Sequence, residues 1–139
     1  MIKEILVANK YIIKTDRLYT EKHEWVKKNG EHWLYGITSY ATIELGEISH
    51  IDFHTVGKSF SKGKTILTIE TLNIKADSYA PFDCKIIEIN EGLEDNAIRV
   101  FNDPYGEGWL VKLECNGTVE GLLSPEEYAN LVKTEATDL

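Results

Sequence analysis

The chain has 139 residues, of which 42% are apolar, and its 15 basic and 23 acidic side chains give a formal net charge of -8. That length fits one compact domain, since single domains cluster near about 100–150 residues. The negative charge argues against nucleic acid or an anionic membrane as a partner and favours a basic protein surface. No stretch approaches the ~20 apolar residues that a membrane span needs.

The N-terminal sequence and the two cysteines both indicate the cell compartment in which the protein resides. Residues 1–20 contain short apolar runs interrupted by Glu4, Asn9 and Lys10, which predicts neither a signal peptide nor a transit peptide. We therefore expect a cytoplasmic protein, or one of the mitochondrial matrix if the source is eukaryotic. Cys84 and Cys115 lie far apart in the sequence and form no CxxC motif. This predicts two semi-buried thiols rather than a zinc site or a redox pair.

Short alternating runs rich in Ile, Val and Thr predict a mainly β protein. Residues 1–17 are expected to add a strand or hairpin before the domain proper. Further strands are predicted at residues 32–37, 48–56, 64–72, 85–90 and 109–113. Turn sequences separate them, such as Asn29-Gly30 and the DPYG run at 103–106. Many strands at short spacing indicate a small sandwich or barrel.

Two helices interrupt this pattern. The first is short, begins at Thr38 or Ser39 as the cap, and ends at Gly46. The second begins with Ser124 as the cap and Pro125 in the first turn, and Glu127 completes a capping box. We expect it to pack as a C-terminal lid, followed by a tail over residues 134–139.

From Leu18 onward, the order and spacing of several motifs resemble the glycine cleavage H protein family, over residues 18–133. The matching pieces are YTEKHEW at 19–25, GIT at 36–38, LGEI at 45–48, the hairpin at 70–81, LEDN at 93–96, DPYGEGW at 103–109 and LLSPEEY at 122–128. Each piece is weak alone, but their joint occurrence in the family's order is a specific pattern. Residues 18–133 are therefore expected to form an H-protein-like lipoyl-type domain.

The resemblance implies both a fold and a function. The fold is a flattened hybrid barrel-sandwich of two antiparallel sheets, of the lipoyl/biotinyl type, with a short internal helix and a C-terminal helix. In the family, a lysine on an exposed hairpin carries lipoate, which takes up the aminomethyl group when glycine is decarboxylated. The implied partners are glycine decarboxylase, aminomethyltransferase and dihydrolipoamide dehydrogenase, or a lipoate-handling enzyme. The implied role in glycine catabolism is that of a carrier protein, not an enzyme.

The hairpin departs from the family at the residue that matters most. The family reads close to E-S-x-K-A-x-S-D-x-Y-S-P, and this chain reads ETLNIKADSYAP at 70–81, with Glu70 and Asp77 in register. The lipoyl-lysine position is therefore Asn73, which has no amine for the lipoyl amide. Sliding the alignment to use Lys75 would move the tip by two residues and each cross-strand partner by four. We favour the ungapped alignment and keep Lys75 as the alternative attachment site.

Other residues are candidates by resemblance or by position. His23 and Glu24 match the family's H-E-W motif, near the groove that shelters the loaded arm. The acidic residues on predicted turns are a candidate docking surface for partner enzymes, and they are Glu91, Glu94, Asp95, Asp103 and Glu107.

No metal site is predicted. His50 and His54 would lie ~13 Å apart along a straight strand, too far for one ion. A pair of Asp52 with one histidine stays open.

Three functions remain in competition. The first is an H-like protein without its own lipoyl arm, still able to bind its partners. The second is a working lipoyl carrier that uses Lys75. The third is an interaction module that keeps only the fold, since a fold does not determine function.

Overall fold

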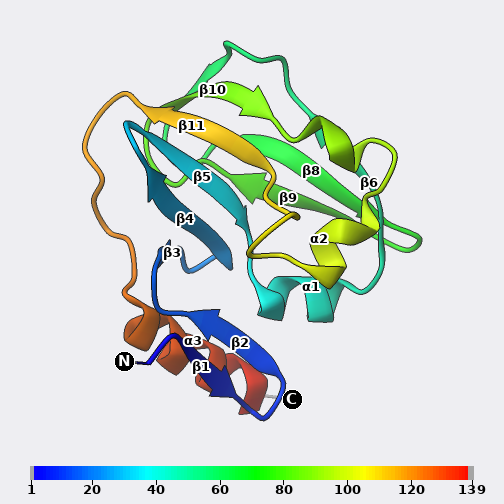
Figure 1. Cartoon of the computed structure of the whole chain (residues 1–139), viewed down its shortest axis with the longest axis vertical. Helices are drawn as coiled ribbons and strands as arrows, with labels where there is room; N and C mark the ends of the chain where they lie inside the picture. Colours follow the sequence, from blue (N-terminus) through cyan, green and yellow to red (C-terminus); the bar gives the residue numbers. More distant parts are fainter. Residues whose placement is uncertain (1, 138–139) are drawn as a thin grey trace.

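A computed structural model describes the backbone of residues 2–137 and the side chains of residues 2–136. It is mainly β, with antiparallel sheets and few helices, as predicted (Figure 1). A six-stranded sheet has the order β3-β4-β5-β11-β10-β7. Its strands are β3 (Leu18–Tyr19), β4 (Glu24–Asn29), β5 (His32–Ile37), β7 (Ser59–Phe60), β10 (Cys84–Ile89) and β11 (Val111–Cys115).

A three-stranded sheet faces the larger one and carries the hairpin of interest. It has the order β6-β8-β9, with β6 at Ile48–Phe53, β8 at Thr65–Thr71 and β9 at Lys75–Tyr79. Ile66, Leu67 and Ile69 of β8 are buried in the same cluster as Tyr35 of β5 and Leu113 of β11. The main core thus lies between the two sheets, where apolar burial stabilises their packing.

Helix α1 (Ser39–Leu45) connects the two sheets. Thr38 caps it through a hydrogen bond from the Ala41 amide at 3.3 Å, and Gly46 ends it at φ 86°. Two short helices that the sequence analysis did not predict follow β10, namely η1 (Glu91–Leu93) and α2 (Ile98–Asn102). Leu93 and Val100 anchor them because both side chains are buried in the main core.

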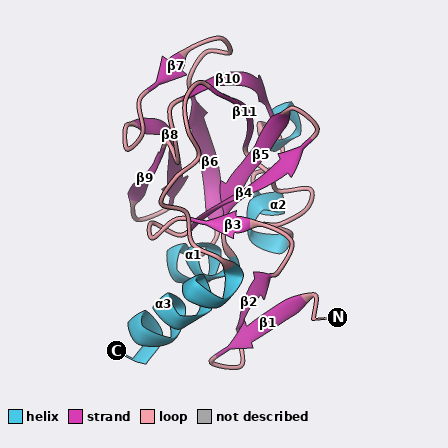
Figure 2. Cartoon of the chain, turned by 90° about the vertical axis from the view of Figure 1, so that its left-hand side faces the viewer, coloured by secondary structure: helices cyan, strands magenta, loops and turns pink. Residues whose placement is uncertain are grey.

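The N-terminal hairpin and the C-terminal helix form a second layer below the sheets (Figure 2). Strands β1 (Glu4–Val7) and β2 (Tyr11–Lys14) pair with each other as a separate sheet and contact α3 (Pro125–Thr137). Tyr19 and Tyr128 stack at 4.4 Å in this second core. Residues 4–14 are therefore packed against the rest of the domain through this second core.

Helix α3 begins with the predicted capping box. The Glu127 amide donates to Ser124 Oγ at 3.1 Å, and the Ser124 amide donates to Glu127 Oε1 at 2.9 Å. The helix continues to Thr137, so residues 134–137, which we expected in a tail, are helical, while residues 138–139 lie outside the described residues. None of the described helices is long and apolar enough to cross a membrane.

Candidate functional site: the β8–β9 hairpin and the groove at its base

The register of β8 and β9 determines where their hairpin turns. Glu70 pairs with Lys75 and Thr68 pairs with Asp77. The Thr71 amide donates to the Ile74 carbonyl at 2.9 Å, which closes the turn. Only Leu72 and Asn73 lie between these two residues. Asn73 is therefore in the tip of the hairpin between β8 and β9, and this hairpin projects to the right in Figure 1.

The backbone and Thr71 build the tip without help from the Asn73 side chain. Thr71 Oγ1 accepts hydrogen bonds from the amides of Asn73 at 3.3 Å and Ile74 at 3.2 Å. Such a threonine turn uses only the backbone amides of the residues that follow it, so it does not depend on the side chain at position 73. The Asn73 side chain is exposed, and Leu72 beside it is 93% exposed. The tip thus presents residue 73 to solvent.

Lys75 lies at the start of the returning strand rather than at the tip. Its Nζ is 3.4 Å from Glu70 Oε1 on the opposite strand, and its side chain is 75% exposed. His50 of β6 approaches the other oxygen of Glu70 at 3.7 Å. An exposed pair of this kind adds only about 0–1 kcal/mol, so it orients the Lys75 amine weakly along the sheet.

Asp77 connects the two strands of the hairpin through hydrogen bonds on one face. Its carboxylate accepts hydrogen bonds from Thr68 Oγ1 at 3.0 Å and from Thr65 Oγ1 at 3.5 Å, both on β8. Together with the Glu70–Lys75 pair, these contacts join β8 to β9 along most of their length. The motif residues Glu70 and Asp77 therefore hold the hairpin that presents residue 73.

A groove of about 440 Å³ lies at the base of the hairpin, and Glu24 lines it. Lys62, Tyr79 and Leu122, from three other segments of the chain, also line it. Glu24 Oε1 accepts a hydrogen bond from Thr20 Oγ1 at 2.8 Å, and Oε2 accepts one from the Tyr79 amide at 2.7 Å. The Glu24 carboxylate thus connects β4 directly to the end of β9.

Burial changes the acidity of this carboxyl group. Glu24 is only 2% exposed, and burial raises its pKa to about 7, against the hydrogen bonds from Tyr79 and Thr20 that favour the charged form. The group can therefore exchange a proton close to neutral pH. A buried, titrating carboxyl group in a groove is a typical feature of functional sites.

His23 does not line this groove, although it precedes Glu24. Its ring lies under helix α3, where Nδ1 is 2.8 Å from Tyr128 Oη and Nε2 is 2.6 Å from Glu135 Oε2. Burial lowers the pKa of His23, and Glu135 partly opposes that effect. The motif therefore splits into Glu24 in the groove, His23 against the C-terminal helix, and the buried Trp25 in the second core.

The predicted acidic residues lie on one segment between β10 and β11. Glu94, Asp95, Asp103 and Glu107 are exposed. Asp103 also has a structural role, because its Oδ2 accepts the Glu107 amide at 2.9 Å. Their place along residues 91–107 makes this segment an acidic edge of the molecule.

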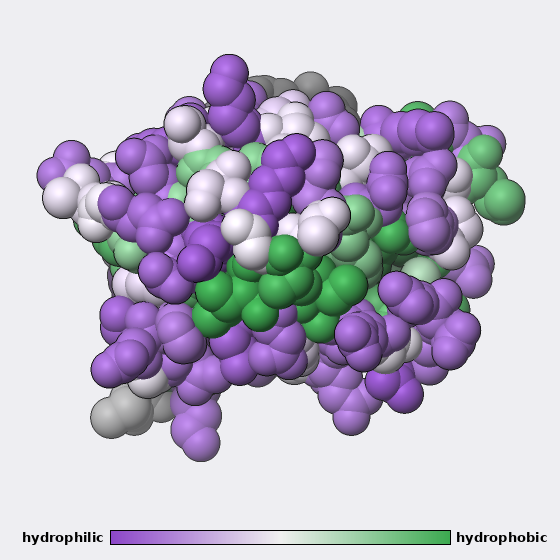
Figure 3. Space-filling model, turned by 90° about the horizontal axis from the view of Figure 1, so that it is seen from above, coloured by the Kyte–Doolittle hydropathy of each residue, from purple (hydrophilic) through white to green (hydrophobic). Residues whose placement is uncertain are grey.

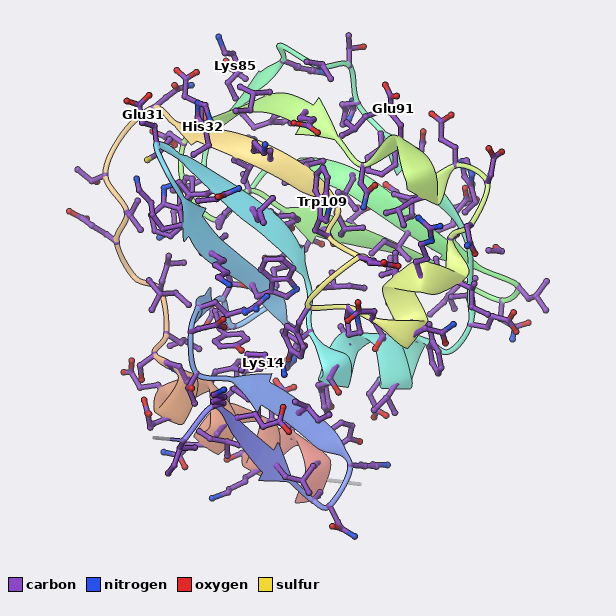
Figure 4. All side chains as sticks on the ribbon, viewed as in Figure 1. Lys14, Glu31, His32, Lys85, Glu91 and Trp109 are labelled. Carbon is purple, nitrogen blue, oxygen red and sulfur yellow. The ribbon has the colours of Figure 1, made fainter. Side chains whose placement is uncertain are left out.

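A second groove of about 380 Å³ adjoins the acidic segment. It is lined by Val56, Ile87, Ile89, Glu91 and Trp109, the last two labelled in Figure 4. Figure 3, seen from above, shows an apolar area bordered by hydrophilic residues on this side of the molecule. Two acidic residues, Glu88 and Glu91, line this groove beside the apolar ones, and this combination suits an interface with a basic rim.

The histidines near β6 do not converge. His54 lies beyond the end of β6, and its ring packs 5.3 Å from that of Phe60, whereas His50 lies beside Glu70. A β-bulge between Ile48 and His50 shifts the strand's alternation. Among the described residues, no group of three or more His, Cys, Asp or Glu side chains could hold a metal ion.

Sequence reasoning missed several residues that shape the site. Thr71 could have been found, since Ser and Thr are typical of the position before a tight turn. Thr20, Lys62 and Tyr79 reach the groove from three different segments, and no local sequence pattern connects them.

Two facing antiparallel sheets, an exposed hairpin tip and a groove at its base together define a lipoyl-type carrier domain. The sequence profile of the family described as "Glycine cleavage H-protein" matches residues 17–135. The chain therefore belongs to the glycine cleavage H-protein family, the non-catalytic carrier component of the glycine cleavage system.

Individual relatives agree with this assignment. The chain is 41% identical over 119 residues to the glycine cleavage system H protein of Herpetosiphon aurantiacus, covering 86% of this chain and 92% of that protein. It is 37% identical over 126 residues to that of Thermus thermophilus, covering 89% and 98%. The crystal structure of the H protein from Mycobacterium marinum superposes with a TM-score of 0.79 at 33% identity, covering 85% of this chain and 97% of that one.

Proposed function

We propose that this chain is an H-like protein of the glycine cleavage system that carries no lipoate of its own. The observation that supports this is the side chain in the hairpin tip, which is that of Asn73. A lipoyl amide needs a nucleophilic amine, and the asparagine amide nitrogen is not one. Residues 70–81 otherwise keep the family's frame, so the proposal concerns the attachment point and not the scaffold.

The rest of the domain supports binding to the family's partners. The groove with Glu24 and the acidic segment at residues 91–107 are the surfaces that such contacts would use. The partner is then glycine decarboxylase, aminomethyltransferase, dihydrolipoamide dehydrogenase or a lipoate-handling enzyme, in the cytoplasm or the mitochondrial matrix. An acidic surface fits a basic docking site on any of them.

Lys75 supports a second candidate, a working carrier. Its side chain is 75% exposed and belongs to the same hairpin. Against it, Lys75 is the first residue of β9 and is paired with Glu70, so its amine lies beside the sheet and not at the tip of the hairpin. Rigid projection of the reacting amine at the tip makes attack productive, and residue 73 has that position.

A gain-of-function variant tests the proposal. Asn73→Lys and Lys75→Ala, alone and combined, would be incubated with lipoate ligase, ATP and lipoate and followed by intact-mass spectrometry. We expect one lipoyl group on Asn73→Lys and on the double variant, and none on Lys75→Ala. A lipoyl group that disappears with Lys75→Ala would establish the Lys75 carrier instead.

A second step tests partner binding. Lipoylated Asn73→Lys would be incubated with glycine and glycine decarboxylase, and loading of the arm with the aminomethyl group would be measured. Loading supports retained docking surfaces. Lipoylation without loading would contradict binding to the decarboxylase and favour an interaction module that keeps only the fold.

A further inference from the structure

The two cysteines are direct cross-strand neighbours in the large sheet. Cys84 begins β10 and Cys115 ends β11, and the two strands lie side by side with these residues paired (Figure 1). Residues opposite each other in an antiparallel pair point to the same face of the sheet. The separation in sequence that suggested two unrelated thiols therefore disappears in the fold.

The hydrogen-bond pattern shows which kind of pair this is. The Asn116 amide donates to the Asp83 carbonyl at 2.8 Å, so Asp83 and Asn116 are a hydrogen-bonded pair. Because such pairs alternate along an antiparallel ladder, Cys84 and Cys115 form the next, non-hydrogen-bonded pair. In that arrangement the Cα atoms are about 4.5 Å apart and the side chains approach more closely. This separation lies within the about 4.4–6.8 Å that a disulfide accepts.

Both thiols are free, but they differ in access. Cys84 is fully buried in the main core, whereas Cys115 is half-buried and packs against the same core. Cys115 Sγ contacts the Gly117 carbonyl at 3.3 Å in the loop that follows β11. A reagent in solution can therefore reach Cys115 before it reaches Cys84.

We propose that Cys84 and Cys115 form a reversible dithiol–disulfide site that is oxidised by exchange with a low-molecular-weight disulfide. The Cys115 thiol loses its proton and attacks one sulfur of the small disulfide, whose S–S bond breaks and releases one thiolate. Cys84 then loses its proton and attacks Cys115 Sγ, which releases the second thiolate. The two released thiolates take up two protons, so two protein thiols are oxidised and one disulfide is reduced.

The second step is the slow one at neutral pH. Burial raises the pKa of the Cys84 thiol to about 12, and the neighbouring Cys115 and Asp83 add to this effect. Since the thiolate is the nucleophile, ring closure accelerates as pH rises. Adjacent placement on paired strands compensates for part of the low thiolate fraction by holding the two sulfur atoms together.

The test uses the folded full chain and oxidised glutathione. After incubation, the reaction would be stopped with acid, the protein unfolded and free thiols alkylated, and intact mass and digested peptides measured. We expect the wild type to lose both free thiols, retain no glutathione, and yield a peptide pair linked through Cys84 and Cys115. A thiol reductant should restore both thiols.

Two variants separate the steps. Cys84→Ala should stop with one glutathione on Cys115, and Cys115→Ala should keep an unreacted Cys84. The linked peptide from the wild type decides the question even if either variant folds poorly. The proposal is overturned if the folded wild type keeps both thiols, or if glutathione stays on Cys115 while Cys84 remains free.

Discussion

Replacing Glu24 by glutamine should change how the stability of the protein depends on pH. The Glu24 pKa is about 7 in the folded protein against an ordinary value of 4.5. A raised folded pKa means that the folded state holds the proton more tightly than the unfolded state does. The contribution of Glu24 to stability is therefore complete below pH 4.5 and is lost as pH rises through about 7. That pKa difference corresponds to about 3 kcal/mol, at about 1.36 kcal/mol per pKa unit.

Glutamine keeps the shape of the side chain and removes the titration. Its carbonyl oxygen can accept from the Tyr79 amide, and its amino group can donate to Thr20 Oγ1, which reverses that bond. Urea unfolding of both proteins, followed by tryptophan fluorescence from pH 4 to pH 8, gives the difference in free energy of unfolding. We expect the wild type to lose about 3 kcal/mol relative to Glu24→Gln across this range.

A matched control isolates the buried carboxyl group. Glu21 also lines the groove but is exposed, so Glu21→Gln should track the wild type at every pH. The burial argument for Glu24 is wrong if the difference in free energy of unfolding between the wild type and Glu24→Gln stays constant with pH. It is also wrong if the wild type becomes more stable relative to the variant as pH rises.

Two further substitutions test the hairpin and the helix cap. Asn73→Lys should change the free energy of unfolding by less than ~0.5 kcal/mol, because the Asn73 side chain is exposed and Thr71 closes the turn. A clear drop in the urea midpoint would show that the asparagine side chain holds the tip. Ser124→Ala should cost about 1 kcal/mol, since it removes the acceptor for the Glu127 amide at the start of α3. An unchanged midpoint in the same unfolding measurement would contradict that capping role.

Local chemistry made much of the fold predictable. Alternation identified β5, β6, β8, β10 and β11 but not β3, β4, β7 or β9, and the caps at Thr38 and Ser124 located the starts of two helices. The place of residue 73 was expected from the resemblance to the family's hairpin, and in the fold Leu72 and Asn73 lie in the turn between β8 and β9. These features depend on residues that are neighbours in the chain.

Features that depend on distant residues were not predictable. The His23 ring meets Tyr128, which is 105 positions away, so its sequence neighbours gave no indication of that contact. The Cys84–Cys115 pairing depends on β10 and β11 joining at one particular register. The bulge between Ile48 and His50 places both Ile48 and Ile51 on the buried face, against simple alternation, and β6 ends at Phe53, before His54. Burial of Leu93 and Val100, not local propensity, stabilises η1 and α2.

The most direct test of the proposed armless H-like protein is the mass of the wild-type chain after exposure to a lipoate ligase, ATP and lipoate. Asn73→Lys in a parallel reaction shows that the enzyme is active and that the hairpin can serve as its substrate. We predict that the wild type keeps its unmodified mass while the variant gains one lipoyl group. A stoichiometric lipoyl group on the wild type, mapped to Lys75 by peptide mass spectrometry, would contradict the proposal.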